Sequence, residues 1–320
     1  AQLMAKERIR TGSMPLAMQK VMGEISGAYS LVIMTPHRMI AARDPQGFRP
    51  LCIGKIKNSW VFASETCALD AVGAEYVRDV DPGEIVVADN DGLHSYTEMC
   101  GNKSSLCIFE YIYFARPDSV IDGQSVHRAR LNAGRFLAKE SPADADVVIG
   151  VPDSGLDAAL GYSYESGIPY GVGFIKNRYI GRTFIQPTQA EREAALRIKL
   201  NAMKEAVAGK RVIMVDDSIV RGTTCGRIVK LLRDAGAKEV HVRISSPPFL
   251  NPCYFGTDID NRKNLIACRM SFEETQKKIG CDSLAYLSID AMHKLVPGCR
   301  LGHCDACFTG NYPVYVPEEN

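Results

Sequence analysis

The feature that most constrains the fold of this chain is an apolar run that ends in two adjacent aspartates. The segment reads Val-Ile-Met-Val-Asp-Asp-Ser-Ile-Val-Arg-Gly-Thr-Thr and spans residues 212–224. Val212 to Val215 is bulky and apolar enough to predict a strand buried on both faces of a parallel sheet. Asp216 and Asp217 then fall at the carboxyl end of that strand, where open α/β sheets place their ligands. The segment therefore predicts an α/β fold with a ligand site at this edge.

The loop after the two aspartates carries groups that bind phosphate. Its hydroxyls and the cation of Arg221 can donate hydrogen bonds, and Gly222 allows a positive φ or a close approach to a ligand. Successive backbone N–H groups in such a loop can cradle a phosphate, and a helix that begins near Thr223 adds the positive end of its dipole. The candidate loop residues are Ser218, Ile219, Val220, Arg221, Gly222, Thr223 and Thr224.

The complete string is more specific than the aspartate pair, which alone fits a generic metal or hinge site about equally well. It resembles the phosphoribosyl pyrophosphate (PRPP) binding motif of the type I phosphoribosyltransferases. The resemblance implies that Asp216 and Asp217 hold the ribose hydroxyls, directly or through Mg²⁺. It also implies that the loop takes the 5′-phosphate.

Length and charge set the broad limits. A chain of 320 residues is long for one domain and sufficient for two domains with separate cores. The net charge of +1, from 38 basic and 37 acidic residues, gives no basic field of the kind that binds nucleic acid. No run of about 18 apolar residues occurs, and the first residues lack the apolar core of a signal peptide. We therefore expect a cytoplasmic protein that binds neither nucleic acid nor membrane.

The first part of the chain reads as a helical start followed by short strands. Residues 1–25 repeat apolar side chains at three- and four-residue steps, which predicts helix. Turn signals rich in Gly, Pro, Asn and Asp then separate short apolar segments. The expected strands are residues 28–34, 39–42, 52–56, 60–63 and 84–88. We expect a mostly antiparallel region that ends near residue 105.

Beyond residue 105 the pattern alternates between strands and helices, which predicts a parallel sheet with helices on its faces. The expected strands are residues 106–113, 146–151, 170–175, 212–215 and 239–244. The expected helices are residues 126–139, 156–166, 190–208 and a helix from about Thr223 that stops at Gly236.

A second strand-to-helix turn, Pro152-Asp153-Ser154-Gly155, follows the apolar residues 147–151. It can sit at the same sheet edge as the two aspartates. Asp153 and Ser154 are also favoured N-cap residues, so an ordinary helix start is the alternative. In the phosphoribosyltransferases a loop at this place receives the pyrophosphate. The resemblance therefore makes Asp153, Ser154 and Gly155 candidate PRPP-binding residues.

Residues 176–184 resemble a mobile lid because three cations fall within seven residues. Three positive charges could neutralise the departing pyrophosphate, and closure would keep water from a reactive ribosyl centre. An ordinary solvated basic loop fits the charges of this segment alone equally well. The candidate catalytic residues of the lid are Lys176, Arg178, Tyr179 and Arg182.

Several further strings are similar to the glutamine phosphoribosylpyrophosphate amidotransferases, and together they cover nearly the whole chain. They are residues 43–51, 62–66, 110–119, 184–187 and 245–248. The resemblance implies an α/β type I phosphoribosyltransferase domain at 106–290. It also implies a preceding β-rich later part of an N-terminal-nucleophile glutaminase domain at 1–105, and a C-terminal segment at 291–320. The magnesium ligands of the family fall on Ser154, Asp216 and Asp217.

One departure from the family is large. The glutaminase of this family uses an N-terminal cysteine whose free α-amine serves as the base, whereas residue 1 is Ala1. Cys52, Cys67 and Cys100 are poor replacements because internal cysteines have no α-amine beside them. We expect an amino-terminally truncated chain that depends on ammonia for its nitrogen.

Eleven cysteines, odd in number and scattered in spacing, do not suggest a disulfide framework in a cytoplasmic protein. By spacing alone, Cys299, Cys304 and Cys307 fit the C-x₄-C-x₂-C pattern of plant-type ferredoxins. The resemblance to the cluster-containing members of the family implies instead a structural 4Fe–4S cluster. Its ligands would be Cys107, Cys253, Cys304 and Cys307. Zinc in a four-thiolate site is the alternative, because spacing does not separate the two.

The resemblance implies that PRPP, glutamine and water are converted to 5-phosphoribosylamine, glutamate and pyrophosphate, the first committed step of purine biosynthesis. It also implies Mg²⁺ as a cofactor, purine nucleotides as inhibitors and a homo-oligomer. A PRPP-binding regulator without catalysis and a purine salvage phosphoribosyltransferase are the alternatives. The near-neutral charge and the β-rich first region disfavour the regulator, which would be expected to carry a DNA-binding module.

Overall fold

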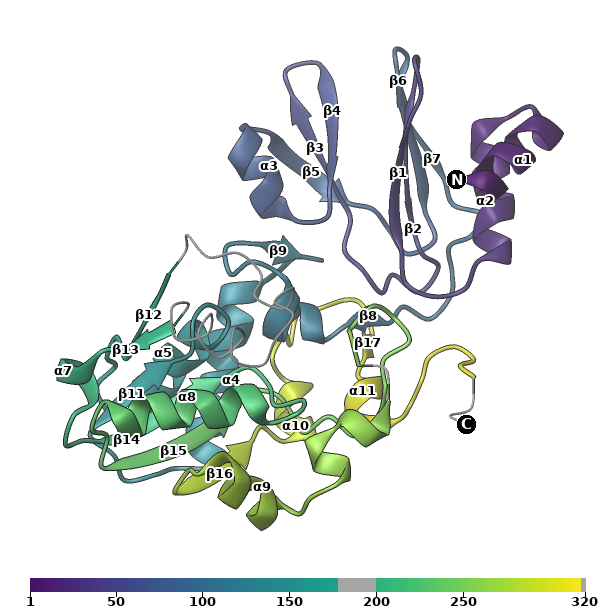
Figure 1. Ribbon diagram of the computed structural model, residues 1–320. Coiled ribbons are helices and arrows are strands. Elements are labelled where there is room, and N and C mark those ends of the chain that lie inside the picture. The colour runs from purple at the N-terminus through teal and green to yellow at the C-terminus, as the bar shows by residue number, and fades with distance from the viewer. Residues whose placement is uncertain (178–199, 260, 318–320) are drawn as a thin grey trace. The chain divides into compact units, whose positions relative to one another are not determined.

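The structure is a computed structural model that describes residues 1–177, 200–259 and 261–317 (Figure 1). The chain forms two compact units. Unit 1 comprises residues 1–126, 252–260 and 298–320, and unit 2 comprises residues 127–251 and 261–297. Each unit therefore combines segments that lie far apart in the sequence.

Unit 1 contains two antiparallel sheets with helices on their outer faces (Figure 1). The first sheet has the order β1–β2–β6–β7, and the second has the order β4–β3–β5. The helices are α1 (Gln2–Thr11), α2 (Met14–Glu24) and α3 (Thr66–Val72). The strands are β1 (Ser30–Met34), β2 (Met39–Arg43), β3 (Cys52–Ile56), β4 (Ser59–Ala63), β5 (Glu75–Asp79), β6 (Ile85–Asp89) and β7 (Gly92–Tyr96).

The alternation of apolar side chains along the strands explains this layering. Ile40 of β2 and Ile85 of β6 pack against Met18 of α2 on one face of the first sheet. The next residue of each strand points to the opposite face, because successive strand side chains alternate. Ala41 and Val86 accordingly belong to the core between the two sheets. The predicted antiparallel region is confirmed, although α3, β5 and β7 were not expected.

The rest of unit 1 joins the middle of the chain to its C-terminal part. The two-residue strands β8 (Leu106–Cys107) and β17 (His303–Cys304) pair in parallel. A π-helix, η1 (Glu110–Phe114), follows β8, and a short helix, α11 (Ala306–Thr309), follows β17. A small hairpin pairs β9 (Val120–Ile121) with β10 (Gln124–Ser125). Residues 298–317 are thus part of the same unit as β8.

Unit 2 is built on a parallel sheet with the order β11–β14–β15–β16. Its strands are β11 (Val147–Gly150), β14 (Arg211–Asp216), β15 (Glu239–Ile244) and β16 (Ser283–Tyr286). The helices are α4 (Val126–Glu140), α5 (Gly155–Ser166), α7 (Lys204–Val207), α8 (Thr223–Asp234), α9 (Phe272–Ile279) and α10 (Ile289–Met292). A separate two-stranded ladder pairs β12 (Phe174–Lys176) with β13 (Leu200–Ala202). The described part of the unit also contains two 3₁₀ turns, η3 (Arg262–Asn264) and η4 (Ile266–Cys268).

The central strand β14 is buried on both faces, as its continuous apolar run predicts. Val212, Ile213, Met214 and Val215 are fully buried. The helix α8 lies along this sheet (Figure 1) and buries Ile228, Val229 and Leu232 from its inner face. The predicted α/β fold with a parallel sheet is confirmed.

Three expected elements are wrong. Residues 106–113 were expected to form one strand, but β8 ends at Cys107 and η1 begins at Glu110. An almost uniformly apolar run is compatible with both a buried strand and a buried helix. Residues 170–175 were expected to be a strand, whereas Tyr170 makes only an isolated bridge and β12 begins at Phe174. Of the helix expected at 190–208, residues 190–199 lie outside the described residues, and the remainder forms β13 and α7.

Within the described residues, no helix combines the length and the apolar character that crossing a membrane requires. The borders of the two compact units differ from the three expected domains. Residues 106–126 and the tail from residue 298 belong to unit 1 rather than to unit 2. The roles assigned to the three domains stay predictions.

Candidate functional site

Two strand-to-helix loops meet at one edge of the parallel sheet of unit 2. β11 and β14 are neighbours, with Gly150 in register with Val215, so both strands end at the same level. β14 ends at Asp216 and is followed by Asp217, and the loop after β11 carries Ser154. Loops at the carboxyl ends of adjacent parallel strands form the usual ligand site of such sheets. The edge predicted from the sequence is therefore the edge where the two loops meet.

A hydrogen bond joins the two loops directly. The hydroxyl of Ser154 donates to Oδ1 of Asp217 at 2.8 Å, and the hydroxyl of Ser218 donates to Oδ2 of the same carboxylate. Asp217 is buried, with 8% of its surface exposed. The three predicted magnesium ligands are thus close in space, and they offer only oxygen atoms, which Mg²⁺ prefers.

Asp216 is buried to the same extent as Asp217. Its Oδ1 accepts the backbone N–H of Asp217 at 2.9 Å, and its backbone carbonyl accepts the N–H of Ser245 at 2.9 Å. Burial, followed by the charge of Asp217, raises the pKa of Asp216 well above its usual value. Two carboxylates held this close favour a bound cation, because a cation relieves both the burial of charge and the repulsion.

The loop of residues 218–224 has the backbone that Gly222 was predicted to allow. Gly222 has a φ of +79° and is the N-cap of α8. A Cβ atom at this position would lie 2.5 Å from Cδ1 of Ile266. The N–H of Ile266 also donates to the carbonyl of Val220 at 2.9 Å, which fastens the loop to η4. The positive end of α8 therefore opens beside a fixed loop, as a phosphate site requires.

Side chains of the loop divide between ligand-facing and structural positions. Arg221, Thr223 and Thr224 are exposed, and Ser218 and Val220 are half-buried. Ile219 is only 3% exposed and belongs to the core of unit 2. Of the predicted PRPP-binding residues, Ile219 can therefore offer a ligand only its backbone groups.

The predicted pyrophosphate loop, residues 152–155, contacts one residue of the predicted lid. The ammonium of Lys176, the last residue of β12, forms an ion pair with Oδ2 of Asp153. Gly155 packs against the end of β14 so closely that a Cβ there would lie 2.5 Å from the carbonyl oxygen of Val215. Arg178, Tyr179 and Arg182 lie outside the described residues, so their roles stay predictions.

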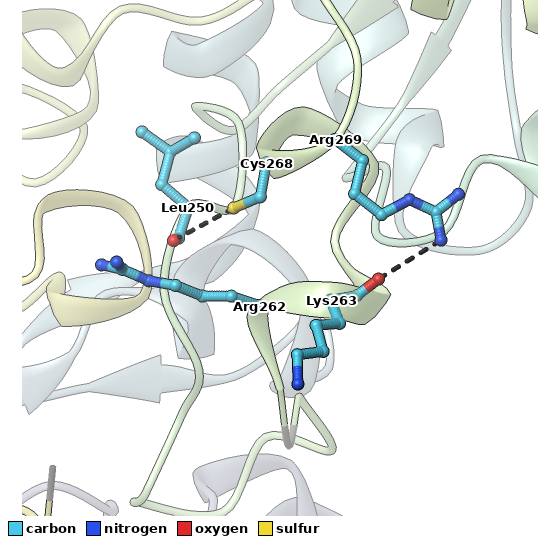
Figure 2. A pocket seen from close by; sticks show the side chains of 5 residues that line it. All are labelled: Leu250, Arg262, Lys263, Cys268 and Arg269. Atoms are coloured by element: carbon cyan, nitrogen blue, oxygen red, sulfur yellow. Dashed lines mark hydrogen bonds between the residues drawn. The ribbon is translucent and has the colours of Figure 1, made fainter. Parts of the chain in front are cut away.

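A cavity of about 490 Å³ elsewhere in unit 2 is lined by other residues: Leu250, Arg262, Lys263, Cys268 and Arg269. Figure 2 shows that its three cationic side chains point in different directions rather than toward one centre. The Cys268 thiol donates to the Leu250 carbonyl at 3.3 Å, and Arg269 donates to the Lys263 carbonyl at 3.2 Å (Figure 2). The sequence did not predict this cavity, and no predicted site residue lines it.

The four cysteines predicted as cluster ligands all lie in unit 1. Cys107 and Cys304 face each other in the β8–β17 ladder, and both are buried. Burial raises the pKa of the Cys307 thiol well above its usual value, and the charges of Cys107, Cys253 and Cys304 raise it further. Cys299 instead has its sulfur 3.9 Å from the hydroxyl of Tyr111. The structure thus places the four predicted cysteines within electrostatic reach of one another.

The described residues contain no group of three or more His, Cys, Asp or Glu side chains already arranged to hold a metal ion. The thiol donors nevertheless have the chemistry that an iron–sulfur cluster or zinc requires. The identity of the bound group therefore stays a proposal.

The sequence did not identify a cation that contacts the segments carrying these thiols. Arg49 forms an ion pair with Glu110 and donates to the carbonyl of Phe255 at 3.0 Å. Arg49 lies in the segment 43–51 and Glu110 in the segment 110–119, both of which carry the family resemblance. That resemblance was the one signal that marked these residues, and it gave them no role.

Comparisons with known proteins match both units. The profile of the phosphoribosyl transferase domain matches residues 124–245, and that of a glutamine amidotransferase domain matches residues 8–71. A protein of Archaeoglobus fulgidus named amidophosphoribosyltransferase is 50% identical over 321 residues, covering 100% of this chain and 70% of its own length. The protein of the same name from Bacillus subtilis is 52% identical over 299 residues, covering 92% of this chain and 63% of its own length.

Solved structures agree with the sequence matches. The glutamine PRPP amidotransferase of B. subtilis complexed with ADP and GMP has a TM-score of 0.89 and 50% identity, covering 99% of this chain and 71% of that chain. A structure described as the allosteric regulatory enzyme of purine biosynthesis has a TM-score of 0.90 and 50% identity, with coverages of 99% and 69%. The chain spans between 52% and 71% of the length of the amidophosphoribosyltransferases that it is similar to.

Proposed function

This chain belongs to the amidophosphoribosyltransferase family, and we propose that its unit 2 transfers ammonia to PRPP with release of pyrophosphate. The product is 5-phosphoribosylamine, the first intermediate of purine biosynthesis. The observation that carries the proposal is the hydrogen bond between Ser154 and Asp217, because it joins the two loops that would hold pyrophosphate and ribose. Glutamine is the proposed source of the ammonia in the complete enzyme.

We assign the parts of PRPP to the groups that match them chemically. The backbone of residues 218–224, the start of α8 and the cation of Arg221 would hold the 5′-phosphate. Asp216 and Asp217 would hold the ribose hydroxyls. Asp153, Ser154 and Gly155 would border the pyrophosphate, with Lys176 as its nearest described cation. A magnesium ion held by Ser154, Asp216 and Asp217 would supply positive charge beside the leaving group.

In the reaction, the nitrogen of ammonia forms a bond to C1 of the ribose while the bond from C1 to the pyrophosphate oxygen breaks. The nitrogen then loses one proton. The residues of this chain hold the two ends of PRPP, and this positioning lowers the activation barrier of the transfer reaction. Lys176, with Arg178 and Arg182 of the lid, would neutralise charge on the departing pyrophosphate.

We also propose that Cys107, Cys253, Cys304 and Cys307 hold a 4Fe–4S cluster, with zinc as the alternative occupant. Support comes from the paired strands that bring Cys107 beside Cys304 and from the mutual effect of the thiols on their pKa values. The cluster would tie the C-terminal part of unit 1 to β8, a structural role that the transfer reaction does not use. Iron and acid-labile sulfide analysis of anaerobically purified protein distinguishes the occupants, because zinc brings no sulfide.

Two further proposals concern partners. The B. subtilis relative was solved with ADP and GMP, and we propose that purine nucleotides also inhibit this protein. We propose that it forms a homo-oligomer, which sedimentation of the purified protein measures directly.

The function is tested by magnesium-dependent release of pyrophosphate from PRPP, with ammonium as the nitrogen donor because the transferase unit needs only ammonia. The double variant Asp216→Asn with Asp217→Asn should lose activity by about 10²-fold or more, since both groups act on the reacting sugar. Asp144→Asn with Asp146→Asn is the matched control. That pair also consists of two nearby aspartates, but both bond Arg211 at the start of β14.

Full activity of the control alongside loss in the first double variant supports the assignment. Near-normal turnover of the Asp216 and Asp217 variant would refute it. PRPP binding without pyrophosphate release would favour a regulatory protein, and release that requires a purine base as acceptor would favour a salvage enzyme. The comparisons favour neither alternative.

A further inference from the structure

A half-buried cation, Arg49, contacts the segments that carry the thiols of unit 1. The Arg49 side chain is only 19% exposed, and three contacts hold its guanidinium. It pairs with Glu110, donates from Nη2 to the carbonyl of Phe255 at 3.0 Å, and lies 4.6 Å from the ring centre of Phe114. These partners come from two segments that carry predicted cluster ligands, so Arg49 connects both segments.

Contacts of Phe48, the residue before Arg49, also connect to the segments that carry the thiols. The N–H of Cys107 donates to the carbonyl of Phe48 at 3.1 Å, which joins the residue before Arg49 to β8. The Phe48 ring stacks on Phe255 with ring centres 4.2 Å apart, and both belong to one core with Cys253 and Cys304. Arg49 is therefore anchored to the two strands and the turn that hold Cys107, Cys253 and Cys304.

The guanidinium occupies space that a side chain at position 256 would fill, so Gly256 is needed there. This residue has a φ of +106°, and a Cβ on it would lie 2.7 Å from Nη2 of Arg49. Phe255, whose carbonyl accepts from the guanidinium, donates its own N–H to Sγ of Cys253 at 3.4 Å. The cation thus contacts the turn that carries Cys253 as well as its carboxylate partner.

We propose that Arg49 is the counterion of the four-cysteine site, and that the Arg49–Glu110 pair sets the net charge beside the group bound there. This inference rests on the proposed 4Fe–4S cluster. Thiolates buried with a cluster form an anion, and buried anions are costly without a paired cation. Net charge near a cluster also sets its reduction potential. Arg49 acts here as a positioning residue, and it takes no part in the transfer reaction.

The two members of the pair should shift the potential in opposite directions. Arg49→Gln removes a positive charge, so adding an electron becomes less favourable and the potential becomes more negative. Glu110→Gln removes the negative charge that offsets Arg49, so the potential becomes more positive. A purely structural disturbance would give no such reversal of sign. Arg49→Gln should also lose iron several-fold faster in air than the wild type, since its anionic site has no counterion.

The experiment measures iron, acid-labile sulfide and the reduction potential of the anaerobically purified full chain and its variants. Arg78→Gln is the matched control, because Arg78 also pairs with a buried glutamate of unit 1, Glu84, and its other hydrogen bonds go to Asp79 and Ser95. Its iron content and potential should equal those of the wild type.

Opposite shifts in the two test variants support the counterion role. Unchanged potentials, or shifts of the same sign, would overturn it while leaving the cluster proposal intact. If Arg49→Gln retains too little cluster for a potential, the sign of the Glu110→Gln shift still decides. A wild-type protein that holds zinc without sulfide, or no metal, would overturn both proposals.

Discussion

Replacing Gly222 by alanine tests whether the phosphate loop depends on this glycine for its backbone and for its contact with η4. The φ of +79° costs a non-glycine residue about 1–2 kcal/mol. The added Cβ would also lie 2.5 Å from Cδ1 of Ile266, whereas the next nearest atom is 3.8 Å away. Crowding of this kind in a packed core costs about 1–3 kcal/mol. The two effects together predict a loss of about 2–5 kcal/mol in the free energy of unfolding.

Gly280 is the matched control because it also lies in unit 2 with a φ of +81°, but no atom lies within 4 Å of its Cβ position. Gly280→Ala should therefore show only the backbone cost of about 1–2 kcal/mol. Adding Ile266→Val to Gly222→Ala removes the clashing methyl group. The double variant should then recover most of the crowding energy, after the usual Ile→Val cost of about 0.5–1.5 kcal/mol.

Urea denaturation monitored by a probe in unit 2 measures these stabilities. The dependence of pyrophosphate release on PRPP concentration gives the KM for PRPP, which reports on the conformation of the loop. Gly222→Ala should raise the KM for PRPP, because the clash pushes the loop away from η4, whereas Gly280→Ala should leave the KM unchanged. Equal destabilisation by the two alanine variants, or no recovery with Ile266→Val, would show that the contact with Ile266 does not constrain the loop.

Three further predictions concern single side chains. Ser154→Ala removes the donor to Asp217 and should raise the KM for PRPP or Mg²⁺ by a factor that corresponds to about 1–3 kcal/mol in pyrophosphate-release kinetics; an unchanged KM would remove Ser154 from the site. Lys176→Gln should lower kcat more than it weakens PRPP binding, because its charge acts on the leaving group; equal binding and turnover losses in titration and kinetics would contradict this. Burial, followed by the charge of Asp122, raises the pKa of Asp79 to about 6. A carboxyl group with a raised pKa contributes stability below about pH 4, and this contribution is lost as the pH rises through 6. The free energy of unfolding of Asp79→Asn relative to wild type should therefore increase by about 1–2 kcal/mol between pH 4 and 7. A difference in urea midpoints that does not change with pH would refute this.

Much of unit 2 could be predicted because its signals are local. The buried run of Val212 to Val215, the aspartates after it and the glycine at the start of α8 are adjacent in sequence. Each follows from side-chain size, charge or permitted φ without reference to distant residues. The convergence of Ser154 on Asp217 was also predictable in outline, since parallel strands carry their following loops to one edge.

The errors occurred where a local pattern permits two structures. Residues 106–113 are almost uniformly apolar, and whether they form a strand or the π-helix at Glu110–Phe114 depends on what packs around them. The end of the helix expected at 190–208 has acceptable helical composition, yet Leu200–Ala202 pairs with β12 instead. Hydrogen bonding to a distant strand overrode local preference in this case.

The strand, the acidic pair and the phosphate loop follow from local sequence, because each depends on residues within one short segment. Three other features depend on packing between distant segments: Arg49 contacts the Phe255 carbonyl, Cys107 faces Cys304 across β8 and β17, and Ile266 packs against Gly222. These contacts join residues separated by tens to hundreds of positions. Their formation depends on how whole elements pack, and the packing of distant elements leaves no periodic or local signal in a single chain.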